Sequence, residues 1–483
     1  MPRLGRRARR ERAVIAALRR WPRLTVFLVS LAWISSLESL FRDQAKDQLY
    51  FQAWTSEYMM QTVSVGDLRH EPFKSLWYNH IQPPVFDGLR AALAAFYPNA
   101  DGDALMRRVD QGLYRLWMLV YAATAVLIFS WLRRAAGERS AIAGSLIFLL
   151  LPGPIFYAAF LDSTLLSATL ILWFFWALWR VGKGEAVSGE LILVCIVLFF
   201  TRSVFQWPFL VVLATSFWLM NTPWKKAMRV LAPITLVMLA FLTKQYVLFG
   251  LTTTSSFGPD SFCKGLSEYC HGTSAVPLPD ITDPYNAYVL RRAEKLNGEY
   301  NYNQEAFLKR SFSQMKEYKA LLAELTPGRA VDLLAINLDF YLRPTSRHSS
   351  HVIVDRLPWR GVAEFVLSGW SFVILLLFSC GIWIRRWSAR APDARRAAFL
   401  HGLGLALPAL YVAAVTIVFE SGENMRYRFF LEPTLFVFFW ISITSLWRKG
   451  AVPDRAATTE SHRDRLTTES VQPKGEAEQG RTR

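Results

Sequence analysis

The chain has 483 residues, of which 52% are hydrophobic and 19% are charged. Its apolar residues gather in blocks of about 17–25, the length of helix that crosses a bilayer, so we exclude a soluble globular protein. The formal net charge is +17. In a chain with spanning segments, cytoplasmic Lys and Arg account for such an excess, so we expect no nucleic-acid partner.

The arginine-rich N-terminus, residues 1–23, precedes a first apolar run from Leu24 to Leu40. A secretory signal peptide begins in the same way, but no cleavage site of small residues follows this run. We therefore predict an uncleaved membrane anchor, with its basic residues in the cytoplasm as the positive-inside rule requires.

Nine further apolar runs predict an all-α polytopic membrane protein with about ten transmembrane helices. These runs are Leu116–Leu132, Ala141–Phe160, Thr164–Trp179, Leu191–Phe200, Val204–Met220, Val230–Phe249, Val362–Trp383, Phe399–Val418 and Phe429–Leu446. The short loops that this topology places inside carry most of the Lys and Arg, which puts both chain ends in the cytoplasm. Because the fourth of these runs is short for a span, residues 191–220 form either two full spans or a re-entrant pair.

The predicted topology divides the chain into five parts. They are a basic cytoplasmic N-terminus (1–23), a transmembrane core (24–249) with a first outer loop (41–110), an extracytoplasmic lobe (250–361), C-terminal transmembrane helices (362–446) and a tail (447–483). The tail lacks apolar periodicity, so we expect it to be disordered and cytoplasmic. An amphipathic run from Tyr302 to Leu325 favours an ordered lobe. Outside the cytoplasm, Cys263 and Cys270 of this lobe predict a local disulfide bond, and their spacing lacks the second pair of ligands that zinc requires.

The first outer loop carries the leading candidates for chemistry. If Phe41–Tyr58 is a helix, Asp43 and Asp47 lie four residues apart on one face, beside a stripe that includes Tyr50 and Trp54. Aromatic side chains on such a stripe suit a helix at the membrane surface. A carboxylate held there can accept a proton from a hydroxyl group, which makes Asp47 the first candidate for a general base. The alternative is an interfacial helix with solvated charges.

His80 stands before the Pro83–Pro84 pair, which predicts the start of a second interfacial helix because proline suits the first turn of a helix. This histidine either binds a substrate phosphate or sugar, or is structural, and a lone histidine is more often structural.

Four cations lie at the outer ends of predicted spans, where the positive-inside rule leaves few: Arg202, Lys244, Arg426 and Arg428. Charges near a bilayer are costly and are usually functional or paired, and arginine suits bidentate contact with phosphate. We therefore predict that the group binds a phosphate-bearing lipid. The alternative is pairing with nearby glutamates, of which Glu423 is also a candidate substrate-binding residue. Asp162, at an outer turn, is expected to cap a helix rather than to act in catalysis.

Seven stretches resemble, in their order and shared outer face, the GT-C class of polytopic membrane glycosyltransferases. They are DQLYFQAW, HIQPPVFDGL, FLDSTLL, LFFTRSVFQW, KQYVLFGLTTTSSFG, FYLRPTS and ENMRYRFFLEP. The resemblance covers nearly all of the membrane-embedded chain and is to the branch that includes protein O-mannosyltransferases and lipid A aminoarabinose transferases.

This resemblance implies a polyprenyl-phosphate-linked sugar donor and an acceptor hydroxyl on a glycan, lipid or protein. It implies an inverting transfer at the outer face of a bacterial inner membrane, with Asp47 as the catalytic base and Asp43 as second choice. The family's His-Pro-Pro-Leu pattern is stretched here to HIQPPV, which leaves the role of His80 open. The acidic pair of the family's first loop is not clean here, so dependence on a divalent metal, Mg²⁺ or Mn²⁺, is open too.

Two other classes of protein share the outer cations. A transporter or flippase of a lipid-linked or anionic substrate requires a polar path at mid-membrane and usually an internal repeat, and the sequence has neither. A structural subunit of an envelope assembly would tolerate alanine at Asp47 and Arg202.

Overall fold

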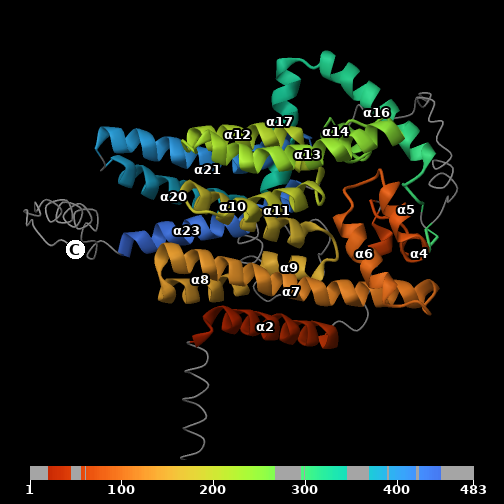
Figure 1. Ribbon diagram of the computed structural model, residues 1–483, viewed down its shortest axis with the longest axis horizontal. Coiled ribbons are helices and arrows are strands. Elements are labelled where there is room, and N and C mark those ends of the chain that lie inside the picture. Colours follow the sequence, from red (N-terminus) through yellow and green to blue (C-terminus); the bar gives the residue numbers. More distant parts are fainter. Residues whose placement is uncertain are drawn as a thin grey trace, which may run out of the picture.

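The computed structural model describes residues 20–44, 56–59, 61–266, 295–298, 300–344, 369–388, 391–419 and 424–447. Every secondary-structure element in these ranges is a helix (Figure 1). The predicted all-α class is therefore confirmed for the part of the chain that the structure describes.

Four helices in the described ranges are long and apolar enough to cross a membrane. They are α7 (Gly102–Ala136), α10 (Thr164–Gly182), α13 (Trp224–Phe249) and α21 (Pro392–Phe419). Helices α8 (Glu138–Leu150) and α9 (Pro152–Ala159) add a fifth if they are one broken span, since they are bent by 57°. Apolar stretches of 10–17 residues occur in α2 (Pro22–Gln44), α11 (Ser188–Phe199), α12 (Trp207–Leu219), α20 (Gly369–Ser388) and α23 (Glu432–Trp447). Each predicted run overlaps one of these helices. The chain is a helical membrane protein, and the ten-span topology stays a prediction.

The break between α8 and α9 follows from proline. Leu151 is extended, with φ −68° and ψ 132°. It precedes Pro152, and the proline ring clashes with a preceding residue in the helical conformation. The carbonyl of Leu149 loses its helical partner and accepts instead from Tyr121 Oη at 2.8 Å and Trp33 Nε1 at 2.9 Å. Buried backbone groups are paired in this way even where a helix is interrupted.

Helix α7 lies at the centre of the packing and contacts α2, α8, α10 and α23. Residues at helical spacing along one face are completely buried: Trp117, Tyr121, Ala125, Ile128 and Leu132. Such a stripe is what places a helix against several neighbours. By contrast, α13 and α21 expose large apolar side chains such as Leu236 (70%) and Leu410 (57%), as expected of helices that face lipid.

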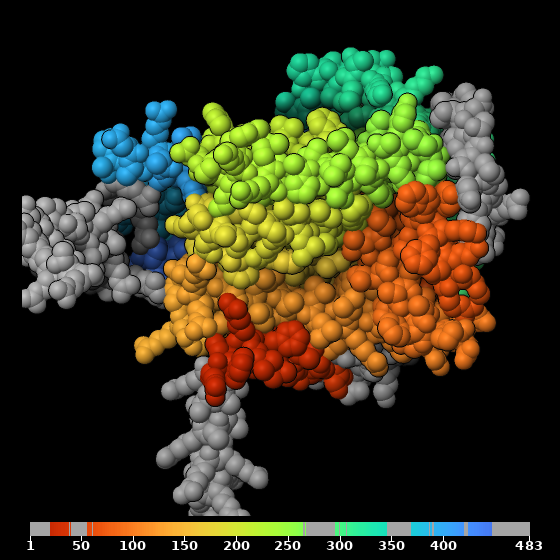
Figure 2. Space-filling model, viewed as in Figure 1, coloured from red at the N-terminus to blue at the C-terminus, as the bar shows by residue number. Residues whose placement is uncertain are grey.

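Four short helices gather at one end of the bundle, which we call the short-helix end (Figure 1). They are α4 (Val65–His70), α5 (Pro72–Trp77) and α6 (Val85–Ala95) of the first loop and α14 (Gly258–Gly265) of the lobe, and the longer α16 (Glu305–Ala323) packs against α14. Figure 2 shows the orange surface of the first-loop helices meeting the yellow-green surface of α13 and α14 there. Helix α6 begins directly after Pro83–Pro84, as predicted, and α16 matches the predicted amphipathic run.

Candidate functional site

The short-helix end joins two of the stretches that carry the resemblance. Helix α13 ends at Gly250, whose φ of 67° is left-handed and therefore suits glycine. The chain then passes beside the HIQPP segment, where Ser256 N donates to His80 O at 2.6 Å and the Ser255 hydroxyl donates to Ile81 O. Ser255 and Ile81, which lie 174 positions apart in the chain, thus belong to one wall.

The connection between α11 and α12 closes this wall on the other side. Val85 N, at the start of α6, donates to Phe200 O at 3.0 Å. Gln206 Nε2 donates to Thr254 Oγ1 at 3.1 Å. The stretches HIQPPVFDGL, LFFTRSVFQW and KQYVLFGLTTTSSFG are therefore fastened together by hydrogen bonds, which sequence order alone did not establish.

A cavity of about 700 Å³ lies at this junction, within the usual range of small-molecule sites, roughly 300–1,000 Å³. Its polar lining includes Gln61 and Gln82 of the first loop and Arg202 from the α11–α12 connection. Its apolar lining includes Phe312 of α16 and Phe419 of α21. The cavity thus combines a guanidinium group and other polar side chains with aromatic ones, from chain segments that are distant in sequence.

Two of the four predicted cations meet beside the cavity. Arg202 Nη2 lies 3.9 Å and Arg426 Nη1 lies 3.5 Å from the same carboxylate oxygen, Asp162 Oδ2. The Arg202 guanidinium also lies over the rings of Tyr427 and Phe430, at 5.6 and 5.2 Å from their centroids. Ion pairing and cation–π contact hold both side chains in one orientation.

Asp162 performs the predicted capping contact as well. Its Oδ1 accepts from Thr164 N in the first turn of α10 at 2.8 Å, while Ser163 occupies the N-cap position itself. The same carboxylate therefore satisfies a helix start and anchors two arginines, a second role that the sequence analysis did not assign to it.

The other two predicted cations point elsewhere. Arg428 is fully buried; it donates to Glu432 Oε1 at 3.0 Å, to Arg343 O at 2.9 Å and to the carbonyl of Tyr341. It thereby ties α17 (Pro327–Leu342) to α22 (Asn424–Phe429) and does not line the cavity. The prediction that all four cations gather at one site is wrong for this residue, because its position in α22 turns it towards backbone carbonyls.

Lys244 is also away from the cavity lining. Its Nζ lies over three aromatic rings, at 5.4 Å from the centroid of Trp77, 4.9 Å from Phe241 and 5.7 Å from Phe249. No hydrogen-bond partner of this buried ammonium occurs among the described residues. The ammonium group therefore contacts aromatic rings where we predicted a phosphate. Lys244 and these rings form a cluster separate from that of Arg202.

His80 belongs to this second cluster. It is 1% exposed, its Nδ1 lies 2.8 Å from Ser256 Oγ, and its backbone N donates to Asn303 Oδ1 at 3.1 Å. Burial, with a smaller contribution from Lys244, lowers the pKa of His80 to about 3. The imidazole is therefore neutral and holds the two loops together, which corresponds to the structural alternative for this residue.

Several predicted site residues lie outside the described part of the chain. Asp47, Glu423 and Cys270 are among them, and Asp43 falls in the last turn of α2, where its side chain is not described. Cys263 is disulfide-bonded. The catalytic role of the first-loop aspartates and the pairing of the cysteines therefore stay predictions.

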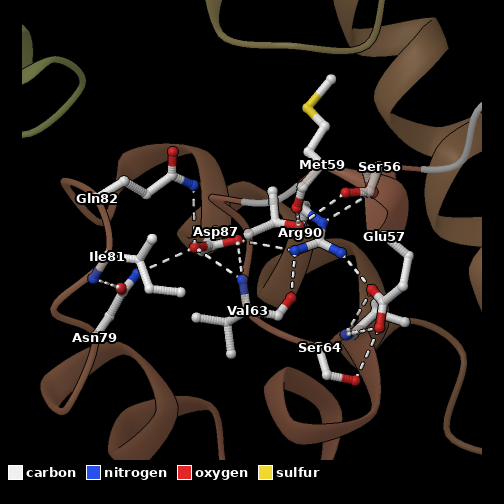
Figure 3. Close-up of polar contacts among 12 residues, drawn as sticks. Ser56, Glu57, Met59, Val63, Ser64, Asn79, Ile81, Gln82, Asp87 and Arg90 are labelled. Carbon is white, nitrogen blue, oxygen red and sulfur yellow. Dashed lines mark hydrogen bonds and ion pairs between the residues drawn. The ribbon is translucent and has the colours of Figure 1, made fainter. Parts of the chain in front are cut away.

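A buried ionic network behind the cavity was not predicted (Figure 3). Arg90 of α6 is completely buried and pairs with Glu57 Oε2 at 2.6 Å and with Asp87 Oδ1 at 2.8 Å. Lys295 Nζ, from the lobe, donates to the carbonyl of Glu57 at 3.0 Å. The signal in the sequence is an Asp and an Arg three residues apart on the apolar stripe of VFDGLRAAL, a spacing that pairs charges on a helix.

Burial raises the pKa of the Asp87 carboxyl, and the Arg90 charge opposes that rise. Its other neighbours are donors: Asn79 Nδ2 at 3.0 Å, Gln82 Nε2 at 3.2 Å and Val63 N at 3.3 Å. The network therefore connects the first loop, α6 and the cavity wall at Gln82.

Among the described residues, no group of three or more His, Cys, Asp or Glu side chains is arranged to hold a metal ion. No protein-family model matches the chain, and comparison with curated proteins yields no match. The function is therefore inferred from the cavity and the groups around it.

Proposed function

We propose that this protein transfers a sugar from a polyprenyl-phosphate-linked donor to an acceptor hydroxyl at the outer face of a bacterial inner membrane, as a GT-C glycosyltransferase. The observation that supports this most is the position of Arg202. Its side chain is held by Asp162 and two aromatic rings, and it lines a cavity whose lining also includes the aromatic side chains Phe312 and Phe419. A lipid phosphate is complementary to this lining, because it joins an anion to an apolar tail.

In the proposed reaction, the acceptor oxygen attacks the anomeric carbon of the sugar as the bond to the phosphate oxygen breaks, with inversion. Asp47 takes the proton of the acceptor hydroxyl, and Asp43 is the second candidate for that role. Arg202, which lines the cavity, stabilises the departing polyprenyl phosphate as negative charge develops on it. Arg426, held by the same carboxylate oxygen of Asp162, adds a second positive charge beside the cavity.

The apolar lining indicates where the lipid lies. Trp207, Phe312 and Phe419 come from three separate helices of the bundle and lobe, and Trp207 is 62% exposed. Indole side chains are enriched at the membrane–water interface. The polyprenyl chain therefore enters from the bilayer alongside α12, and the sugar lies towards Gln61 and Gln82.

The test is transfer by the purified full-length protein in lipid nanodiscs, supplied with radiolabelled undecaprenyl-phosphate glucose, mannose or 4-amino-4-deoxyarabinose. Arg202→Gln is expected to lower turnover by at least about 100-fold, the usual effect of removing one preorganised charge-stabilising group. Asp47→Asn is expected to abolish it nearly completely. Arg133→Gln is the matched control, since this arginine is 45% exposed at the opposite end of α7.

Wild-type turnover in both Arg202→Gln and Asp47→Asn would refute these assignments. A flippase is distinguished in liposomes, because it moves the labelled lipid between leaflets without cleaving the bond between sugar and phosphate.

A further inference from the structure

A glutamine on the cavity wall has a fixed amide. Gln82 lines the cavity, and its Nε2 donates to Asp87 Oδ2 at 3.2 Å. Figure 3 shows the amide nitrogen turned towards Asp87 and the amide oxygen pointing away from it. Among the described residues, none donates a hydrogen bond to that oxygen. This cavity-lining residue therefore has an amide oxygen that can accept a further hydrogen bond.

The surroundings of Asp87 enforce this orientation. The carboxylate is completely buried and accepts from Val63 N, Asn79 Nδ2 and Arg90 Nη1 in addition to Gln82. Since all four neighbours are donors, the carboxylate acts here as an acceptor. A rotated amide would place the Gln82 oxygen against a carboxylate oxygen and lose a charge-assisted hydrogen bond.

The neighbouring glutamine lacks such a device. Gln61 also lines the cavity, but no carboxylate in the described part of the chain holds its amide. Its side chain must lose rotational freedom whenever it binds a ligand, which offsets much of one hydrogen bond. Gln82 has lost that freedom already, so it discriminates better between ligands.

We propose that Gln82 is a specificity-determining residue that accepts a hydrogen bond from one hydroxyl group of the sugar, with Asp87 as its positioning residue. This inference rests on the proposed function, since it places the sugar beside Gln82 in the same cavity. A site that accepts a hydrogen bond from a hydroxyl group rejects the analogue that lacks this hydroxyl, because the acceptor is then left without a partner.

The test measures binding without turnover. The probes are C-glycosidic farnesyl phosphonates that carry glucose, mannose or arabinose, the monodeoxy analogues of the sugar that binds best, and farnesyl phosphonate without a sugar. Gln82→Met keeps the length of the side chain and removes the amide. We expect it to weaken binding of the best sugar-bearing probe about tenfold, the effect of one hydrogen bond, and to leave the sugar-free probe unchanged.

The deoxy series identifies the contact. At one position, the wild type and Gln82→Met are expected to bind the deoxy analogue equally, because each lacks one half of the same hydrogen bond. Gln61→Met is expected to retain the wild-type pattern. A cooperative unfolding transition in each of the three proteins establishes that both variants are folded.

Three results would overturn the proposal. They are a wild type that binds sugar-bearing and sugar-free probes equally, a Gln82→Met variant that weakens both kinds of probe alike, and a variant that retains every deoxy preference. Selective binding of the sugar together with absence of transfer would leave the role of Gln82 intact and refute the proposed function alone.

Discussion

Acid should destabilise this protein through His80 more than through an ordinary histidine. Its pKa falls from the ordinary 6.5 to about 3 because it is buried, with Lys244 nearby. Between these two values the unfolded chain binds a proton that the folded chain excludes, so stability is full above pH 6.5 and is lost as the pH falls towards 3. Lowering the pH from about 7.5 to about 5 should cost about 2 kcal/mol from this group alone.

The assay is denaturant unfolding in mixed micelles at both pH values, for the wild type and for His80→Gln. The variant keeps an amide beside the Ser256 hydroxyl and does not titrate. It is expected to be less stable at neutral pH but to lose about 2 kcal/mol less on acidification than the wild type. An equal loss in both proteins would show that His80 is accessible to protons in the folded state, contrary to the burial described above.

Two further predictions concern packing. Arg90→Met removes the cation between two buried carboxylates and should lower the free energy of unfolding by about 3–5 kcal/mol. Lys74→Met, at an exposed ion pair, should change it by less than about 1 kcal/mol. Similar losses in both variants would contradict the burial of the network. Gly369→Ala places a Cβ 2.5 Å from the backbone of Leu342 and should cost about 1–3 kcal/mol. Gly88→Ala, with no atom within 4 Å in helix α6, should instead stabilise the protein by about 0.5–1 kcal/mol; unfolding midpoints that move in the same direction would refute the distinction.

The positions of the apolar helices were predictable, because a run of apolar residues long enough to cross a bilayer can be recognised directly in the sequence. The lengths were less predictable. Residues 203–205 form a 3₁₀ turn before α12 begins at Trp207, so the predicted run from Val204 is shortened by local backbone geometry that hydropathy does not record.

The cations show why the site was harder to predict. Position along a span indicates depth, but the direction of a side chain depends on rotation about the helix axis, which packing decides. Arg426 and Arg428 lie two residues apart in α22 and are therefore separated by about 200° around it. The first reaches Asp162 and the second reaches the carbonyl of Arg343. Helix geometry could have predicted that these two arginines point in opposite directions, but it could not have predicted the aromatic surroundings of Lys244.

The hydrogen bonds that fasten the first loop also constrain when the protein can assemble. The backbone N–H of His80 finds its acceptor in Asn303, 223 residues later, and Glu57 meets the backbone N–H of Leu296, 239 residues later. A chain synthesised from its N-terminus contains the first loop long before either partner exists. Polar groups that end up buried must therefore remain without these partners until residues 296–303 have been synthesised. The cavity is consequently among the last parts of the molecule to form, and an interruption of synthesis before residue 303 leaves a chain without the cavity residues of α16.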